Sequence, residues 1–193
     1  NLQLPPIVEK TVEINVDIEH HTSRQVGLAM APTICQHIIN YMDQLNELKD
    51  KIVIFYRHHN VRDYFLQLER FKSAVRIDGQ IKFDWQLTNL EAFNEYGTHR
   101  VALVNLHCAC ALNITAANHI FFVELPYTWG EREQAISRCH RLGQKKSVYV
   151  TYFVHQSDTV LESVERQGEE LTRILDGKAS ANLVSSKDCS PHG

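Results

Sequence analysis

The sequence predicts an α/β fold in which helices cover a parallel β-sheet. From about Val53 onward, short runs of β-branched and aromatic residues alternate with amphipathic helical patterns. These runs are apolar at nearly every position, as expected of strands that are buried on both faces of a parallel sheet. The chain has 193 residues, of which 44% are hydrophobic and 22% are charged, so it can bury a substantial core.

Strands and helices are expected to alternate along this part of the chain. Strands are expected at residues 52–56, 74–77, 101–105, 119–124 and 148–154. Helices are expected at residues 61–71, 84–95 and 131–142, and a short turn is expected at 115–117. Each strand would then join the next through a crossover, and such crossovers are right-handed in parallel sheets.

A lead-in strand and helix are expected before this series. Apolar residues fall at even positions from Val8 to Ile18, interrupted at Lys10, which predicts an amphipathic strand with its charged residues outward. A helix is expected at residues 33–49, because apolar side chains recur along one face there.

One more helix is expected to close the lobe. Apolar residues recur at helical spacing through 157–175. From Gly177 onward Ser, Ala, Lys and Asn dominate, and this composition predicts a disordered tail. The expected division is therefore a lead-in at 1–49, an α/β lobe at 50–176 and a disordered tail at 177–193.

Residues 134–146 carry most of the chemical information. A helix is expected to begin near Gly130, because Thr128 and Glu131 have the spacing of a capping box. Gly143 is the expected end of that helix, since glycine is the preferred residue just past a helix C-terminus.

Gln134, Arg138 and Arg141 would form one polar stripe on this helix, at positions i, i+4 and i+7. A guanidinium is always charged and presents a planar fork of donors, so a rigidly held pair suits the charge of a transferring phosphoryl group. An arginine finger of this kind contributes about 10³ to 10⁵ in rate. The alternative is a solvated basic helix face beside Glu131 and Glu133.

Charge and cysteine content narrow the functional classes. The net charge is −3, so any nucleic-acid contact must come from a local patch. The five cysteines are an odd number, and Cys108-Ala-Cys110 lacks the two-residue gap of zinc knuckles, so neither a disulfide framework nor structural zinc is expected. No apolar run approaches the roughly 20 residues that span a bilayer, and no secretory leader is visible. A nuclear or otherwise intracellular protein without a membrane partner is expected.

Four stretches resemble helicase motifs in the order in which helicases carry them. Residues 54–58 and 75–79 fall where motif IV and the segment after it would lie, and 112–125 resembles motif V and the strand that follows. Residues 134–144 match the motif VI pattern Q-x-x-x-R-x-x-R-x-G-Q at every fixed position. Over residues 50–175 the chain therefore resembles the C-terminal RecA-like lobe of SWI/SNF-type, superfamily two, ATP-dependent DNA translocases.

The resemblance implies both a fold and a function. The fold would be the RecA-like parallel sheet of a second helicase lobe, and the Glu124-Leu125 and Arg-Ile-Asp-Gly wording is most like the annealing-helicase subgroup. The function would be that of a motor lobe in a DNA-dependent ATPase of the chromatin-remodelling or replication-fork and repair type. Its partners would be a first RecA-like lobe, which holds most of the ATP and Mg²⁺, and duplex or branched DNA. The phosphate-binding string G-x-x-x-x-G-K-[ST] is absent, so the lobe alone is expected to be inactive.

The resemblance also assigns roles to single residues around ATP. It makes Arg141 the arginine finger, Arg138 its companion on the γ-phosphate side and Gln134 the orienting group. Gly143 completes the expected ATP-binding set.

Contacts to the DNA backbone are implied for Arg57 and His58 and for Asn113 and Thr115, whose side chains can donate to phosphate oxygens. For Asn113, loop capping is an equal alternative.

Departures from the family pattern keep other functions open. Ala111 stands where the family has Gly, Gln86 where it commonly has Arg, and Tyr127-Thr128-Trp129 where Trp-Asn-Pro is usual. A methyl group at position 111 removes the freedom to adopt positive φ. A degenerate lobe acting as a non-catalytic binding or scaffold module would explain these changes. An RNA-directed helicase of the same superfamily is a third reading, which the wording of residues 139–150 fits less well than a DNA translocase.

Overall fold

Six parallel strands form one continuous sheet at the centre of the molecule. The computed structural model describes residues 3–47, 49–95, 99–108 and 112–187, with side chains described up to residue 178. The strand order is β1-β6-β5-β2-β4-β3, and every neighbouring pair is parallel. The strands are β1 (Ile7–Glu13), β2 (Ile52–Tyr56), β3 (Val75–Ile77), β4 (Val101–Asn105), β5 (His119–Phe122) and β6 (Val148–Val154).

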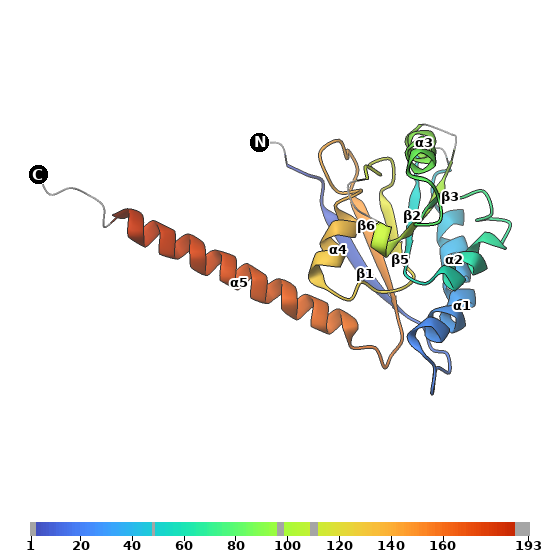
Figure 1. Ribbon diagram of the computed structural model, residues 1–193, viewed down its shortest axis with the longest axis horizontal. Helices are drawn as coiled ribbons and strands as arrows, with labels where there is room; N and C mark the ends of the chain where they lie inside the picture. The colour runs from blue at the N-terminus through green and yellow to red at the C-terminus, as the bar shows by residue number, and fades with distance from the viewer. Residues whose placement is uncertain (1–2, 48, 96–98, 109–111, 188–193) are drawn as a thin grey trace, which may run out of the picture.

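Helices cover both faces of this sheet (Figure 1). They are α1 (Ser23–Asp43), α2 (His59–Leu66), α3 (Phe83–Asn94), α4 (Trp129–Ile136) and α5 (Val160–Lys187), with a 3₁₀ turn η1 (Leu106–Cys108) after β4. One apolar core joins α1 and α2 to the sheet, and a second core joins α3 and α4 to it. Along β2 the side chains alternate between the two cores, Val53 and Phe55 in one and Ile52, Ile54 and Tyr56 in the other. The expected α/β parallel fold is confirmed.

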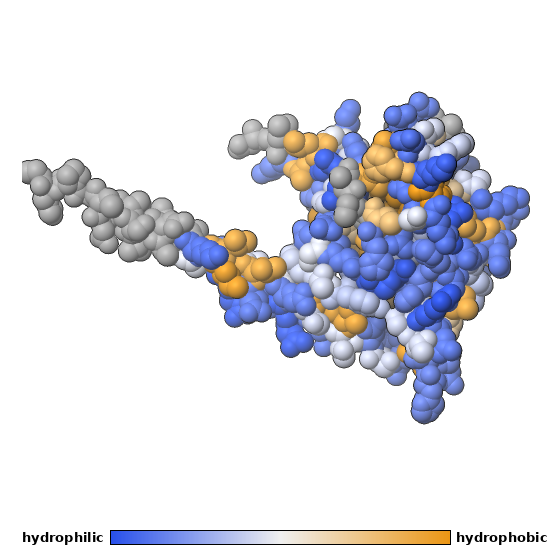
Figure 2. All heavy atoms as spheres, in the orientation of Figure 1, coloured by the Kyte–Doolittle hydropathy of each residue, from blue (hydrophilic) through white to orange (hydrophobic). Residues whose placement is uncertain are grey.

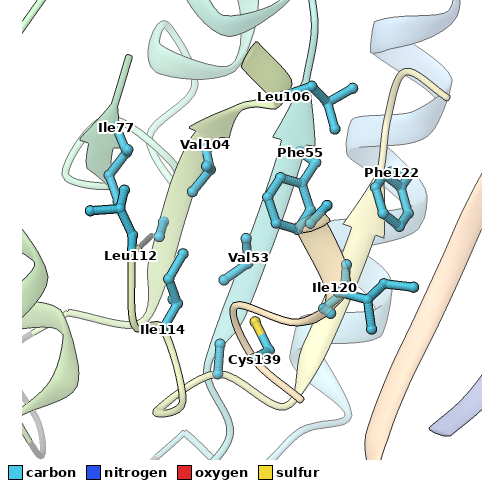
Figure 3. Packing of buried hydrophobic residues seen from close by; sticks show 14 of the residues in the cluster. Val53, Phe55, Ile77, Val104, Leu106, Leu112, Ile114, Ile120, Phe122 and Cys139 are labelled. Carbon is cyan, nitrogen blue, oxygen red and sulfur yellow. The ribbon is translucent and has the colours of Figure 1, made fainter. Parts of the chain in front are cut away.

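The second core fills the space beneath α3 and α4 (Figure 3). Phe55 and Phe122 stack there with ring centroids 5.3 Å apart, and Ile114 and Cys139 belong to the same cluster and lie near the amino ends of the strands. Burial raises the pKa of the Cys139 thiol to about 12, so this cysteine is a neutral packing residue.

β1 is an edge strand that pairs with β6 along its full length. Val8 is 48% exposed, and burial begins only at Val12 and Ile14, where the chain reaches the core beneath α1. The amphipathic pattern expected from Val8 onward is therefore wrong for its first half, because this part of the edge strand lies outside the core beneath α1. Through β1 and α1, the lead-in shares one sheet and one core with the rest of the lobe.

α1 begins at Ser23, ten residues before the expected start at 33, and ends at Asp43. A capping box fixes its start: the Gln25 amide donates to Thr22 Oγ1 (3.3 Å), and the Thr22 amide donates to Gln25 Oε1 (2.9 Å). Pro32 lies inside the helix on an exposed position. The expected bounds of 33–49 are wrong at both ends, because the apolar pattern does not mark the cap at Thr22 or the end at Asp43.

α5 continues to Lys187, so the first eleven residues of the segment that was expected to be disordered from Gly177 are helical. Figure 1 shows α5 projecting away from the sheet. Its start is held by Trp129, which packs so closely on Gly168 that a Cβ there would lie 2.5 Å from the indole. Farther along, Leu171 and Leu175 are 47% and 65% exposed, and Figure 2 shows this apolar stretch on the projecting part of α5. None of the helices in the described ranges is both long and apolar enough to cross a bilayer.

Candidate functional site

α4 ends at Ile136, so Arg138 and Arg141 lie in the turns that follow the helix. The expected helix to residue 142 and its i, i+4, i+7 stripe are therefore wrong. In a longer helix the carbonyls of Arg138 and Cys139 would accept from Leu142 and Gly143. Here they accept from the Ile114 amide (2.9 Å) and from Gln144 Nε2 (3.1 Å). A contact with a distant segment has replaced the last turns of the helix.

The expected N-terminal cap of α4 is present, but the expected stop is not. Thr128 Oγ1 accepts from the Glu131 amide (3.1 Å), as a capping residue should. Gly143 lies in a turn seven residues beyond the helix, where its φ of 103° is open to glycine and strained for other residues. Gly143 thus terminates the arginine-bearing turns rather than α4.

The two arginines differ in how they are held. Arg138 is half-buried, and its Nε donates to the carbonyl of Gln134 (3.0 Å), which keeps these two residues together. Arg141 is exposed, and among the residues that the structure describes its guanidinium has neither a hydrogen bond nor an ion pair. A fixed backbone carrying an unpaired guanidinium is the arrangement required of a group that binds an anion.

Asn113 and Thr115 lie beside this arginine segment. Asn113 Oδ1 accepts from both the amide (3.1 Å) and the hydroxyl (2.8 Å) of Thr115, which is an Asx-type turn. Ile114, between them, is fully buried and donates its amide to Arg138. Asn113 itself is exposed. Ala111, where the sequence departs from the family glycine, lies outside the described residues.

Gln144 joins the same two segments through its side chain. Its Nε2 faces the carbonyls of Thr115 (3.0 Å), Ala117 (2.9 Å) and Cys139 (3.1 Å), and its Oε1 accepts from the Lys146 amide (3.1 Å). Gln144 is 8% exposed. The sequence indicated this residue only as a letter in a motif, and no periodicity or charge pattern signalled its contacts.

Arg57 follows β2 and is already paired. Its guanidinium is 7% exposed, bonds to Glu131, donates to the Leu125 carbonyl (3.0 Å) and lies 3.6 Å from the centre of the Tyr127 ring. A buried guanidinium with these partners holds the start of α4 against the sheet and is not free to approach a DNA phosphate. The expected contact of Arg57 with DNA therefore stays a prediction, and in this structure its guanidinium is occupied by protein partners.

His58 and Glu124 form a second contact at this edge. The amides of Arg57 and His58 donate to Glu124 Oε2 (2.6 and 2.7 Å), and His58 Nδ1 lies 2.5 Å from Glu124 Oε1. Gly27 of α1 permits this packing, because a Cβ there would lie 2.5 Å from Glu124 Oε1. The sequence signalled neither the close packing at Gly27 nor the pairing of Glu124, because both depend on residues that are far apart along the chain.

The structure thus divides the expected site residues between two edges of the sheet. Arg57 and His58 lie at the carboxyl end of β2, whereas Ala117, which Gln144 holds, leads directly into the amino end of β5. β2 has five residues, which places about 15 Å between these edges at ~3.3 Å per residue. Asn113, Thr115, Gln134, Arg138 and Arg141 are together; Arg57 and His58 are not with them.

A buried carboxylate organises the loop after β3. Asp78 is fully buried and pairs with Arg62 (3.3 Å) and Arg76 (3.2 Å). Gln86, which replaces the common arginine of the family, donates to the carbonyls of Asp78 (2.6 Å) and Ile81 (2.9 Å). In this chain Gln86 therefore stabilises the loop itself. Nowhere in the described ranges do three or more His, Cys, Asp or Glu side chains gather in a manner suited to a metal ion.

Comparison with known proteins defines the class of this lobe. A family model described as the helicase conserved C-terminal domain matches residues 32–143, which is more than half of the chain. The chain belongs to this helicase C-terminal domain family. Its relatives identify it as a C-terminal lobe of the SWI/SNF type, the family that its motifs V and VI resemble.

Three curated relatives illustrate this similarity. The SWI/SNF-related matrix-associated actin-dependent regulator of chromatin subfamily A-like protein 1 homolog of Caenorhabditis elegans is 30% identical over 73% of this chain and 21% of its own length. DNA repair protein rad8 of Schizosaccharomyces pombe is 36% identical over 58% of this chain and 10% of its own length. DNA annealing helicase and endonuclease ZRANB3 of Homo sapiens is 29% identical over 68% of this chain and 12% of its own length. The chain spans about a fifth or less of each.

One solved structure has the same fold. The C-terminal part of the Fun30 ATPase domain matches with a TM-score of 0.60 and 16% identity, over 77% of this chain and 48% of that chain. At this identity the likeness concerns the fold alone, and it confirms the RecA-like sheet of a second helicase lobe.

Proposed function

We propose that this chain is the second motor lobe of an ATP-dependent DNA translocase, and that Arg138 and Arg141 stabilise charge on the phosphates of ATP. The observation that carries this proposal is the Arg141 guanidinium, which is exposed and unpaired on a turn whose neighbouring backbone is fixed by Ile114 and Gln144. A preorganised cation aimed at developing charge needs no rearrangement during the reaction, and this is the usual source of its catalytic effect.

The other expected ATP-binding residues fit supporting roles. Gln134 supplies the carbonyl that holds Arg138 Nε, and its own carboxamide is exposed. Gly143 provides the positive-φ turn that returns the chain from Arg141 to Gln144. ATP with Mg²⁺ would be bound mainly by a first lobe, because this chain has no phosphate-binding glycine-rich string. The lobe alone would then not hydrolyse ATP.

The contact to DNA falls to Asn113 and His58. The Thr115 hydroxyl donates its proton to Asn113 Oδ1, so it orients the Asn113 side chain and leaves the amide Nδ2 for a phosphate oxygen. His58 has one ring nitrogen on Glu124 and a side chain that is 25% exposed. Thr115 and Arg57 accordingly hold their neighbours in place. These contacts to the DNA backbone carry no sequence specificity. This suits a protein that moves along duplex or branched DNA in chromatin or in repair. We therefore place the protein in the nucleus.

The test is ATP hydrolysis by the full natural polypeptide that contains this chain, with and without DNA. Arg141→Ala is expected to lower the DNA-stimulated rate by about 10³. The matched control is Arg166→Ala, because Arg166 is an exposed arginine of α5 that makes no hydrogen bond or ion pair among the described residues. A wild-type protein without DNA-stimulated hydrolysis would instead support a non-catalytic scaffold, which the Tyr127-Thr128-Trp129 departure favours.

A further inference from the structure

The Gln144 carboxamide is the side-chain connection between the 112–118 segment and the 137–146 segment. One amide nitrogen faces three backbone carbonyls, two from the first segment (Thr115 and Ala117) and one from the second (Cys139). The amide oxygen accepts from Lys146, which fixes the orientation of the carboxamide. All four contacts lie in an 8% exposed position, from which water is largely excluded.

Only one other hydrogen bond joins these segments among the described residues, and it is a backbone bond. The Ile114 amide donates to the Arg138 carbonyl (2.9 Å). Ile114 lies between Asn113 and Thr115 in the sequence. Arg138 and Cys139 are consecutive, so Ile114 and Gln144 donate hydrogen bonds to two successive carbonyls of the 137–146 segment. A displacement of the Asn113–Thr115 turn is therefore transmitted to the backbone that carries Arg138.

Lys146 secures the far end of the arginine segment to the sheet. Its Nζ bonds to the Lys49 carbonyl and lies 3.7 Å from Asp50 Oδ1, next to the amino end of β2. With this end anchored, the residues between Cys139 and Gln144 form a short loop. The Gln144 side chain holds one end of this loop, and His140 Nε2, which lies 2.7 Å from the Pro5 carbonyl oxygen, holds it against the start of β1. Arg141 lies at the middle of that loop.

We propose that Gln144 is a positioning residue that couples DNA contact at the Asn113–Thr115 turn to the placement of Arg138 and Arg141. This inference rests on the proposed function, and it adds the physical route by which DNA stimulates hydrolysis. Gln144 touches neither ATP nor DNA in this account. It transmits the position of one turn to the other through its three carbonyl contacts.

The chain provides a closely matched control in Gln86. Both glutamines are 8% exposed, and both use Nε2 to bind backbone carbonyls. The two carbonyls held by Gln86, those of Asp78 and Ile81, belong to one loop outside the arginine segment. Loss of the Gln86 carboxamide removes two contacts within one loop, whereas loss of the Gln144 carboxamide removes four, and of the two glutamines only Gln144 joins the two segments.

The experiment uses the full natural polypeptide and compares Gln144→Met and Gln144→Asn with Gln86→Met. Met keeps the side-chain length without donors, and Asn keeps the amide but withdraws it by one methylene. The readout is the ratio of the ATP hydrolysis rate at saturating duplex DNA to the rate without DNA. Both Gln144 variants are expected to lower this ratio by about tenfold to a hundredfold, the cost of a misplaced catalytic group, while Gln86→Met leaves it within about twofold.

This ratio separates positioning from simple destabilisation. A smaller folded fraction lowers both rates by the same factor and leaves the ratio unchanged. An unchanged ratio in the folded Gln144 variants, or an equal fall in Gln86→Met, would overturn the inference. If Gln144→Met does not fold, the milder Gln144→Asn decides by the same criterion. A wild-type protein whose hydrolysis ignores DNA would overturn the proposed function itself, and that result does not depend on any variant.

Discussion

The carboxyl and amino edges of the sheet use arginine in opposite ways. At the carboxyl edge, Arg57 is 7% exposed and bound to Glu131, and Glu124 takes the neighbouring amides. At the amino edge, Arg141 is exposed and unpaired within the described part of the chain, although the backbone around it is fixed. Both arginines lie in motif-like segments. The presence or absence of a carboxylate partner, rather than the residue type, distinguishes a structural arginine from one that is available to a ligand.

The largest expected loss of stability follows from Glu131→Ala at the carboxyl edge. It leaves the buried Arg57 guanidinium without its carboxylate and removes the acceptor of the Tyr127 amide. Breaking such a pair costs about 3 kcal/mol. Urea unfolding of this chain measures it. Glu133→Ala is the control, because Glu133 is 52% exposed and its loss should cost at most about 0.5 kcal/mol. Equal losses in the two variants would contradict a structural role for the Arg57 pair.

A smaller loss is expected from Gly27→Ala, which tests the packing behind Glu124. The added methyl group would lie 2.5 Å from Glu124 Oε1 and 2.9 Å from Val61 Cγ2, so the Glu124 side chain must shift, which strains the bonds that its Oε2 accepts from the Arg57 and His58 amides. We expect a loss of about 2 kcal/mol. Gly177→Ala is the control in α5, since nothing lies within 4 Å of its added Cβ, and it should stabilise by up to about 1 kcal/mol. A stabilised Gly27→Ala would show that Glu124 is not held as described.

The helix cap that begins the arginine-bearing segment is expected to contribute less. Thr128→Ala removes the acceptor of the Glu131 amide and should cost about 1 kcal/mol. Thermal unfolding measures the loss of stability, and Thr88→Ala is the control. The Thr88 hydroxyl donates to the Asp84 carbonyl within α3 and caps no helix. If the Thr128 variant is as stable as the Thr88 variant, the cap does not stabilise the start of α4, and the Arg57–Glu131 pair fixes it instead.

A pH dependence of stability should report on His119 at the amino edge of the sheet. Burial lowers the pKa of His119. Its Nδ1 forms a hydrogen bond with the Tyr41 hydroxyl (2.9 Å), and its Nε2 lies 3.6 Å from Asp50 Oδ1. The folded state then binds fewer protons than the unfolded state, so stability falls as the pH drops through and below the unfolded value near 6.5. In urea unfolding between pH 7 and 5, His119→Asn should flatten this slope relative to wild type. A steeper slope in the variant would mean that the buried ring favours the charged form.

Much of the sheet could be predicted from the sequence, because its central strands need no partner to be recognised. Strands at 52–56, 101–105 and 148–154 coincide with β2, β4 and β6, since continuous apolar β-branched runs have few alternatives. The end of α4 could not be predicted. It depends on Ile114 and Gln144, which take carbonyls that a helix would otherwise use.

The candidate site was foreseen in its residue types but not in its division between the two edges. Arg138, Arg141 and Asn113 are close together because adjacent segments of the same core carry them. Arg57 was expected to reach DNA, and its burial was hidden from the sequence because Glu131 is 74 residues away along the chain. Pairing of this kind has no local signature, whereas the glycine at 143 and the cap at Thr128 do.

The central claim is that Arg141 is free for a ligand and Arg57 is not, and one paired measurement tests it. Arg141→Met and Arg57→Met would be compared for unfolding free energy in this chain and for DNA-stimulated ATP hydrolysis in the full polypeptide. We predict that Arg141→Met changes stability by at most about 0.5 kcal/mol and lowers the rate by about 10³. Arg57→Met should lose about 3 kcal/mol, with a far smaller fall in rate per folded molecule. An Arg141→Met protein that keeps its rate, or that is destabilised as much as Arg57→Met, would contradict the account.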